Sequence, residues 1–165
     1  MVYVLLGTGF EETEAIAPID LLRRAGVKVL TVGIGSKTVY GGHGIGVEAD
    51  ITLEEMDLTD LEMIVLPGGL GGVATARASQ KALDALRFAW ENDKFVAAIC
   101  AAPLIFGRRG LLHSKNATCF PGFENELAGA VIVNAPVVTD GNITTANGME
   151  SALLFGKELV ALLTK

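Results

Sequence analysis

Short apolar runs alternate with amphipathic segments along this chain, and the alternation predicts strands followed by helices. Residues 2–6 form the first apolar run, which is typical of a buried strand. The next segment is amphipathic, with apolar residues at helical spacing: Ile16, Ile19, Leu22 and Ala25. Residues 27–32 predict a second strand. A strand–helix–strand unit of this length indicates a parallel sheet.

The same alternation continues toward the C-terminus. Further strands are expected at 61–66 and 95–99, and shorter ones near 117–119 and 142–145. Further helices are expected at 79–91, from Pro103 to Arg109, and at 149–163. The glycine-rich segment 33–50 predicts a hairpin or short edge strands. The pattern therefore predicts one α/β domain over residues 1–165, a doubly wound and mostly parallel sheet with helices on both faces.

Composition narrows the class of protein. The chain has 165 residues, half of them hydrophobic (50%), which suits a sheet covered on both faces. A net charge of -6 argues against nucleic acid and anionic membranes as partners. Apolar stretches are too short to span a bilayer, and the first strand begins without a basic leader. We therefore expect a cytoplasmic protein whose two cysteines are free thiols.

Cys100 has the most informative position for chemistry. In open α/β sheets, ligands bind beyond the carboxyl ends of the strands, and Cys100 directly follows the strand at 95–99. A residue between a strand and a helix start sits in a sharp turn, and the helix N-terminus would favour a thiolate. The alternative is an inert buried cysteine, a frequent state of this residue type.

Three other segments are expected near Cys100. Gly68 and Gly69 follow the strand at 61–66, and the N–H groups of Gly69 and Ala101 would form an oxyanion pocket, although a Pro-Gly-Gly run also makes an ordinary turn. Glu14 starts the first helix in an apolar setting, where a half-buried carboxyl would hydrogen-bond a thiolate or shuttle a proton. Glu11 and Glu12 fit the ordinary acidic start of a helix.

The sequence contains no motif for a metal or a cofactor. His43 and His113 are isolated from each other and from the cysteines, so no zinc-site spacing exists. The glycine-rich stretch 41–46 is not followed by the Lys-Ser/Thr pair of a phosphate loop. We therefore expect neither a bound metal nor a cofactor.

Four motifs together resemble a known family. They are GFEETEA at 9–15, DLLRRAG at 20–26, LPGG at 66–69 and AAICAAP at 97–103. In order and over nearly the whole chain, they resemble the ThiJ/PfpI superfamily, in the branch of the Parkinson's-associated protein deglycase and its bacterial relatives. The resemblance implies a flavodoxin-like α/β sandwich related to class I glutamine amidotransferases, and a homodimer.

The resemblance also implies roles for individual residues. Cys100 matches the family's oxidisable nucleophile, and Glu14 matches the carboxyl that hydrogen-bonds it. Gly68, Gly69 and Ala101 match the backbone around the oxyanion pocket. Arg24 matches an arginine at an anion-binding spot near the dimer interface.

Two positions depart from the family pattern. Ala101 follows the cysteine where the protease-like branch has a histidine, which argues against peptidase activity. Phe120 stands where the deglycase branch often has a histidine, so Glu14 is the only evident proton carrier. Cys119 beside it is either a second redox thiol or a small buried strand residue.

The resemblance leaves several functions open. One is enzymatic: Cys100, assisted by Glu14, attacks 2-oxoaldehydes or the adducts they form on glycated proteins, without a cofactor. Another is a non-catalytic oxidative-stress sensor or redox chaperone in which Cys100 becomes a sulfinic acid. The family's older label, thiazole monophosphate biosynthesis, is a third, but no phosphate-cradling motif supports it.

Overall fold

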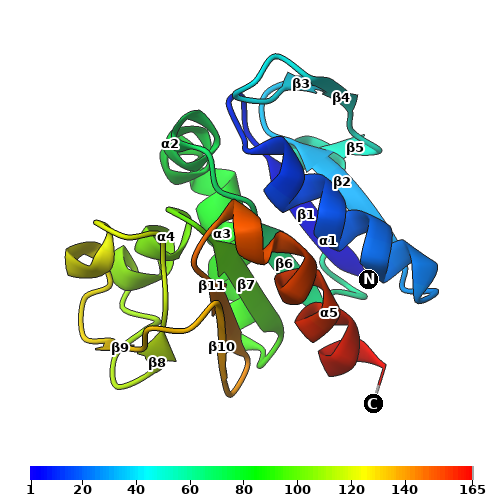
Figure 1. Ribbon diagram of the computed structural model, residues 1–165. Helices are drawn as coiled ribbons and strands as arrows, with labels where there is room; N and C mark the ends of the chain where they lie inside the picture. The colour runs from blue at the N-terminus through cyan, green and yellow to red at the C-terminus, as the bar shows by residue number, and fades with distance from the viewer. Residues whose placement is uncertain (165) are drawn as a thin grey trace.

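A seven-stranded sheet forms the centre of the protein in the computed structural model, which describes residues 1–164 (Figure 1). Its strands lie in the order β10–β11–β7–β6–β1–β2–β5. Their bounds are β1 Val2–Leu6, β2 Val29–Gly33, β5 Ile51–Thr52, β6 Met63–Leu66, β7 Phe95–Ile99, β10 Val137–Asp140 and β11 Ile143–Ala146. Neighbouring strands are parallel except β10 and β11, which are antiparallel. The prediction of a mostly parallel sheet is confirmed.

The order of the longer parallel strands is that of a flavodoxin-like fold. If β1, β2, β6, β7 and β11 are numbered one to five in chain order, their order across the sheet is 2-1-3-4-5. In this arrangement the order of the strand connections reverses between β1 and β6, and folds of this kind bind ligands beyond the carboxyl ends of these two strands. Glu14 lies in the first turn of the helix that follows β1, and Gly68 lies in the loop that follows β6. The fold therefore places both residues at the edge of the sheet where proteins of this architecture bind their ligands.

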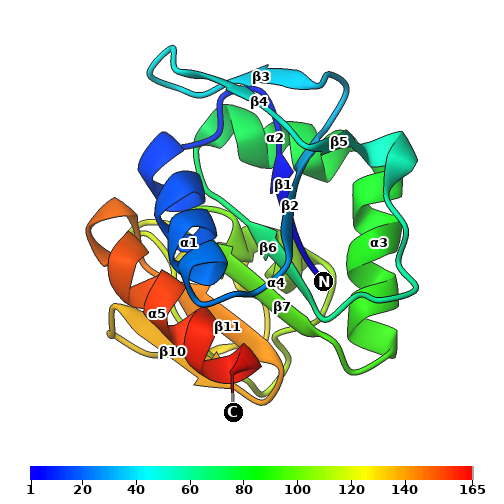
Figure 2. The same ribbon diagram turned by 90° about the vertical axis from the view of Figure 1, so that its right-hand side faces the viewer.

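Helices cover both faces of the sheet, as the sequence predicts. The helices α1 and α5 lie side by side on one face, and α2, α3 and α4 lie on the other (Figures 1 and 2). Their bounds are α1 Glu12–Arg24, α2 Leu70–Ala78, α3 Gln80–Glu91, α4 Pro103–Arg108 and α5 Ala152–Leu163. Within residues 1–164, no helix is both long enough and apolar enough to cross a membrane.

The core consists of two layers because side chains alternate along each strand. In β1, Val2, Val4 and Leu6 pack with α1 and α5, whereas Tyr3 and Leu5 pack with the helices of the other face. Every residue of this strand is buried. A strand in the middle of such a sheet has no solvent-facing side, which explains its continuous apolar sequence.

The predicted apolar face of α1 is partly wrong. Ile19 and Leu22 are buried, but Ile16 has an exposed fraction of 43% and Ala25 is also exposed. Besides Ile19 and Leu22, the buried residues of this helix are Glu12, Glu14, Ala15 and Pro18. Two carboxylates thus occupy part of the inward face because the N-terminus of α1 adjoins the loop at Gly68 and the loop around His43.

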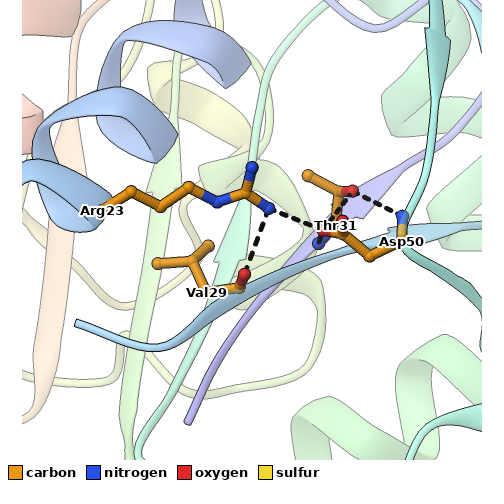
Figure 3. A network of polar contacts seen from close by, with 4 residues as sticks. All are labelled: Arg23, Val29, Thr31 and Asp50. Atoms are coloured by element: carbon orange, nitrogen blue, oxygen red, sulfur yellow. Dashed lines mark hydrogen bonds and ion pairs between the residues drawn. The ribbon is translucent and has the colours of Figure 1, made fainter. Parts of the chain in front are cut away.

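A polar network fastens the edge of the sheet to the end of α1 (Figure 3). Oδ2 of Asp50 accepts hydrogen bonds from the Thr31 N–H at 2.8 Å, the Thr31 hydroxyl at 2.9 Å and the Arg23 guanidinium at 2.6 Å. The same guanidinium donates to the carbonyl of Val29 at 3.2 Å. Burial opposes ionisation of Asp50, but the bonds from Thr31 and Arg23 outweigh it and lower its pKa.

Short elements account for most differences from the prediction. The segment 33–50 does contain a hairpin, formed by β3 (Thr38–Tyr40) and β4 (Gly46–Glu48). The expected strand near 117–119 is the two-residue β8 (Asn116–Ala117), which pairs with β9 (Val131–Ile132) outside the main sheet. The expected helix at 149–163 begins as a 3-10 turn and becomes α-helical at Ala152.

The sequence pattern did not predict α2 or the edge strand β10. The first turn of α2 contains Gly71 and Gly72, which weaken the helical signal. Its glycines lie against the first loop: a Cβ on Gly71 would come within 2.9 Å of the Thr8 carbonyl, and one on Gly72 within 2.8 Å of the Phe10 Cα. Close packing of the start of α2 against the first loop therefore determines these glycines, and helix propensity does not.

Candidate functional site

Cys100 occupies a strained turn between β7 and α4. Its φ is +66°, a left-handed conformation that non-glycine residues adopt rarely and at a cost. Two backbone bonds hold the turn: the Cys100 N–H donates to the carbonyl of Ala146 at 2.9 Å, and the Phe120 N–H donates to the Cys100 carbonyl at 2.8 Å. This shape resembles a nucleophile elbow, in which the turn lifts a reactive side chain out of the backbone.

Glu14 reaches this turn from the first helical turn of α1. Its exposed fraction is 1%, and its Oε2 accepts a buried hydrogen bond from the Gly68 N–H at 2.9 Å. The carboxyl group also hydrogen-bonds the thiol of Cys100. Glu11 caps the same helix by accepting from the Glu14 N–H at 2.7 Å. The fold therefore brings a carboxyl and a thiol together inside the protein.

The loop after β6 has room for glycine only. A Cβ on Gly68 would lie 2.6 Å from the Cβ of Cys100 and would also overlap the Glu14 carboxylate. Gly69 adopts a φ of +86°, and the Gly68 carbonyl accepts from the Glu11 N–H at 2.9 Å. These glycines let the loop touch both α1 and the Cys100 turn.

Two backbone donors point at the sulfur of Cys100. They are the N–H groups of Gly69 and Ala101, and both lower the pKa of the thiol. Donors in this position stabilise negative charge on the sulfur atom or on an oxygen of a group bonded to it.

The expected low pKa of Cys100 is wrong. Burial, followed by the negative charge of Glu14, raises the pKa of the thiol to about 12, and the two backbone donors do not offset this. The short helix α4 begins only at Pro103, so it contributes little of the favourable field that the sequence predicts.

Burial also raises the pKa of Glu14, to about 7. Close to neutral pH the pair therefore loses one of its two protons and keeps the other. Because the groups are hydrogen-bonded, the remaining proton can pass from sulfur to carboxylate without leaving the site. An arrangement of this kind can provide a thiol with a base beside it.

Comparison with known proteins gives the family. The DJ-1/PfpI family matches residues 1–162. The chain belongs to this family. A curated relative, protein dj-1beta from Drosophila melanogaster, is 33% identical and aligns with 94% of this chain and 85% of its own length. A protein named as a deglycase from Pyrococcus horikoshii is 31% identical, and the alignment covers 98% of each chain.

Solved structures of DJ-1/PfpI proteins have the same fold. Oxidized Toxoplasma gondii DJ-1 superposes with a TM-score of 0.94 at 30% identity, covering 98% of this chain and 89% of that one. Drosophila DJ-1beta superposes with a TM-score of 0.92 at 32% identity, again covering 98% of this chain and 89% of that one.

Protein DJ-1 homolog B from Arabidopsis thaliana is 37% identical over 96% of this chain, which spans only 37% of that relative's length.

Arg24 lies away from the Cys100 turn. It ends α1, about 15 Å farther along the helix than Glu14 at a rise of about 1.5 Å per residue. Its Nε donates to Asp20 Oδ2 at 2.7 Å in an exposed pair. Its predicted contact with an anion or a dimer partner stays a prediction.

Phe120, whose N–H is hydrogen-bonded to the Cys100 carbonyl, and the preceding Cys119 lie beside the Cys100 turn. Phe120 is 45% exposed and lines a cavity of about 360 Å³ with Pro121 and Met149. Cys119 is buried, and burial raises the pKa of its thiol to about 11. Its surroundings fit the interpretation as a buried structural residue.

The role of Glu12 was missed in the sequence. Its carboxylate accepts from the His43 N–H at 2.7 Å and pairs with the His43 ring at 2.8 Å. Burial opposes its ionisation, but these bonds outweigh burial and lower the pKa of Glu12, while the pKa of His43 is raised. Glu11 lies close enough for the three side chains to share an ion, although their oxygens and nitrogen already bind one another or backbone groups. The pairing holds the β3–β4 hairpin over α1, and a lone histidine among glycines gave no signal for it.

Proposed function

We propose that this protein is a cofactor-free enzyme that converts 2-oxoaldehydes, free or as adducts on proteins, through Cys100 and Glu14. The observation that carries the proposal is the buried hydrogen bond between the Glu14 carboxyl and the Cys100 thiol, beside two backbone donors. Relatives named as deglycases support it.

The reaction begins with addition of sulfur to an aldehyde. Sulfur forms a bond to the aldehyde carbon while its proton passes to the Glu14 carboxylate, and the N–H groups of Gly69 and Ala101 stabilise the developing oxyanion. The oxyanion takes a proton and becomes a hemithioacetal. The addition needs a carboxylate, so it proceeds above the pKa of Glu14 at about 7.

Glu14 then moves protons within the hemithioacetal. It removes the proton from the carbon bonded to sulfur and returns one to the neighbouring carbonyl carbon, through an enediol, which leaves a thioester. Water cleaves the thioester to a 2-hydroxy acid and restores the thiol. For methylglyoxal the sum is addition of one water to give lactate, with no net oxidation.

Lactate formation from methylglyoxal tests the proposal. We expect the wild type to form lactate and the Cys100→Ser variant to form none above background. Glu14→Gln should lower the rate by about 10²–10⁴, the usual contribution of a positioned acid–base group. Cys119→Ser is the matched thiol control and should keep the wild-type rate. An inactive wild type, or an active Cys100→Ser variant, would reject the enzymatic function.

The second candidate is a redox sensor, in which Cys100 is oxidised by peroxide to a sulfinic acid. The donors at Gly69 and Ala101 suit sulfinate oxygens, and a protonated Glu14 would hydrogen-bond them. An oxidized form is known for Toxoplasma gondii DJ-1. Mass spectrometry after mild peroxide should find two added oxygens on Cys100, fewer of them in Glu14→Gln. Equal oxidation of both proteins would remove the supporting role of Glu14.

The proposal includes a single domain, a homodimer and a cytoplasmic location. Two free cysteines fit a reducing compartment.

The homodimer is supported by exposed apolar side chains on the adjacent helices α1 and α5 and in the turn before α5, a surface that a second copy of the chain would cover. They are Ile16, Met149, Leu153 and Leu154. Sedimentation of the wild type should give a dimer, and Leu153→Glu should give a monomer.

A further inference from the structure

A second cavity lies between α3 and the turn that follows α4. Its volume is about 310 Å³, and Cys100 does not line it. One wall is a single face of α3, where Leu83, Arg87 and Trp90 recur at helical spacing. The opposite wall is formed by Arg108 and Arg109 at the end of α4. We call this the arginine cavity.

Positive charge gathers in the arginine cavity although the whole chain has a net charge of -6. Arg108 uses only its Nε to bind Glu126, at 2.8 Å. Nη2 of Arg87 lies 3.5 Å from Oδ1 of Asp84, and both side chains of this ion pair are exposed. Among residues 1–164, Arg109 forms no ion pair. Three guanidinium groups therefore keep N–H donors available to a ligand.

The remaining lining suits an aromatic ring. Trp90 is half-buried, and the floor beside it includes Leu86 and Leu111, whose exposed fractions are 2% and 7%. An indole next to guanidinium groups offers a stacking surface, and the buried leucines supply apolar contact. The volume lies at the lower end of the range for small-molecule sites.

We propose that the arginine cavity binds a small ligand that combines an aromatic ring with a phosphate group, as a nucleoside monophosphate does. The ring packs on Trp90 and the leucine floor, and the phosphate receives charge-assisted hydrogen bonds from Arg108 and Arg109. Glu91 also lines the cavity and accepts a hydrogen bond from an amino group on the ring. This site is separate from the aldehyde chemistry at Cys100 and does not depend on it.

The single tryptophan of the chain gives a direct readout. Because Trp90 is that tryptophan, its fluorescence reports only on this cavity. We expect AMP to change the fluorescence of the full-length protein saturably, and phenyl phosphate to do the same. Adenosine, which lacks the phosphate, and inorganic phosphate, which lacks the ring, should each bind at least about tenfold more weakly. Adenosine or phosphate binding as tightly as AMP would overturn the proposal, as would no response to AMP or phenyl phosphate.

Substitution of the arginines tests whether they bind the phosphate group of AMP. Arg108→Gln and Arg109→Gln should each weaken AMP binding about tenfold, since each removes charge-assisted bonds to phosphate. Lys28→Gln removes one positive charge from an exposed position outside the cavity and should leave binding unchanged. Both arginines are exposed, so the variants should fold, which circular dichroism checks. Wild-type affinity in both arginine variants would contradict the assignment. Cys100→Ser should bind AMP normally whether or not the aldehyde chemistry exists.

Discussion

The carboxyl group of Glu14 hydrogen-bonds the thiol of Cys100 inside the protein, and burial raises the pKa of both groups. The charge of Glu14 raises the pKa of Cys100 further, whereas the hydrogen bond with the thiol lowers the pKa of Glu14. Such a pair keeps one proton at neutral pH and can move it between oxygen and sulfur.

Glu14→Gln should change how stability depends on pH. The pKa of Glu14 is raised from 4.5 to about 7 in the folded protein, so between these values the folded state binds one more proton than the unfolded state. The free energy of unfolding of the wild type should therefore fall by up to about 3 kcal/mol as the pH rises from 4.5 to 7. Glu14→Gln should lack this loss in thermal or urea unfolding across that range, whereas Glu54→Gln, an exposed control, should retain it.

Glu14→Gln should also make the Cys100 thiol easier to ionise. In the wild type above neutral pH, the carboxylate charge adds to burial in raising the thiol pKa to about 12. A neutral glutamine removes that charge, so burial alone still raises the pKa of the thiol. We expect Cys100 in the variant to react faster with iodoacetamide at mildly alkaline pH, as followed by mass spectrometry. A slower reaction would mean that the carboxylate promotes attack by accepting the thiol proton more than its charge opposes ionisation of the thiol.

Gly68→Ala should disrupt the site by crowding. The added methyl would lie 2.6 Å from the Cβ of Cys100, so the loop must shift, at a cost of about 1–3 kcal/mol in unfolding free energy. Lactate formation should fall as the Glu14 hydrogen bond to this loop is lost. Gly42→Ala is the matched control, because a Cβ there would have its nearest neighbour at 3.6 Å. Equal effects of both substitutions on activity would contradict the crowding.

Asp50→Ala should destabilise the protein more than Arg23→Ala. Removing the carboxylate leaves the N–H and hydroxyl of the buried Thr31 without their partner, which costs about 1–3 kcal/mol. The Arg23 side chain is 47% exposed, so its ion pair with Asp50 should contribute less than about 1 kcal/mol. Urea denaturation measures both values. The opposite ranking would show that the ion pair, and not the bonds to Thr31, holds the sheet edge.

Much of the fold could be predicted because strands and helices differ in the period of their apolar residues. The main parallel strands, α1, α3 and the start of α4 at Pro103 follow from that period and from local signals. α2 could not be predicted, because its glycines are dictated by the first loop packed against it. The exposed Ile16 likewise depends on which face of α1 the fold buries.

Sequence alone determined the position of Cys100 at a strand-to-helix turn, since strand, cysteine and Pro103 are adjacent in the chain. It also indicated Glu14 and the Gly68 loop as neighbours, because parallel strands end at a common edge. Only the tertiary structure decided how the thiol ionises. Burial and charge depend on groups that are distant in sequence, and here they outweigh the local helix start and raise the pKa of Cys100. The arginine cavity arose in the same way, because only packing of α3 beside the end of α4 brings Trp90 and Arg109 together.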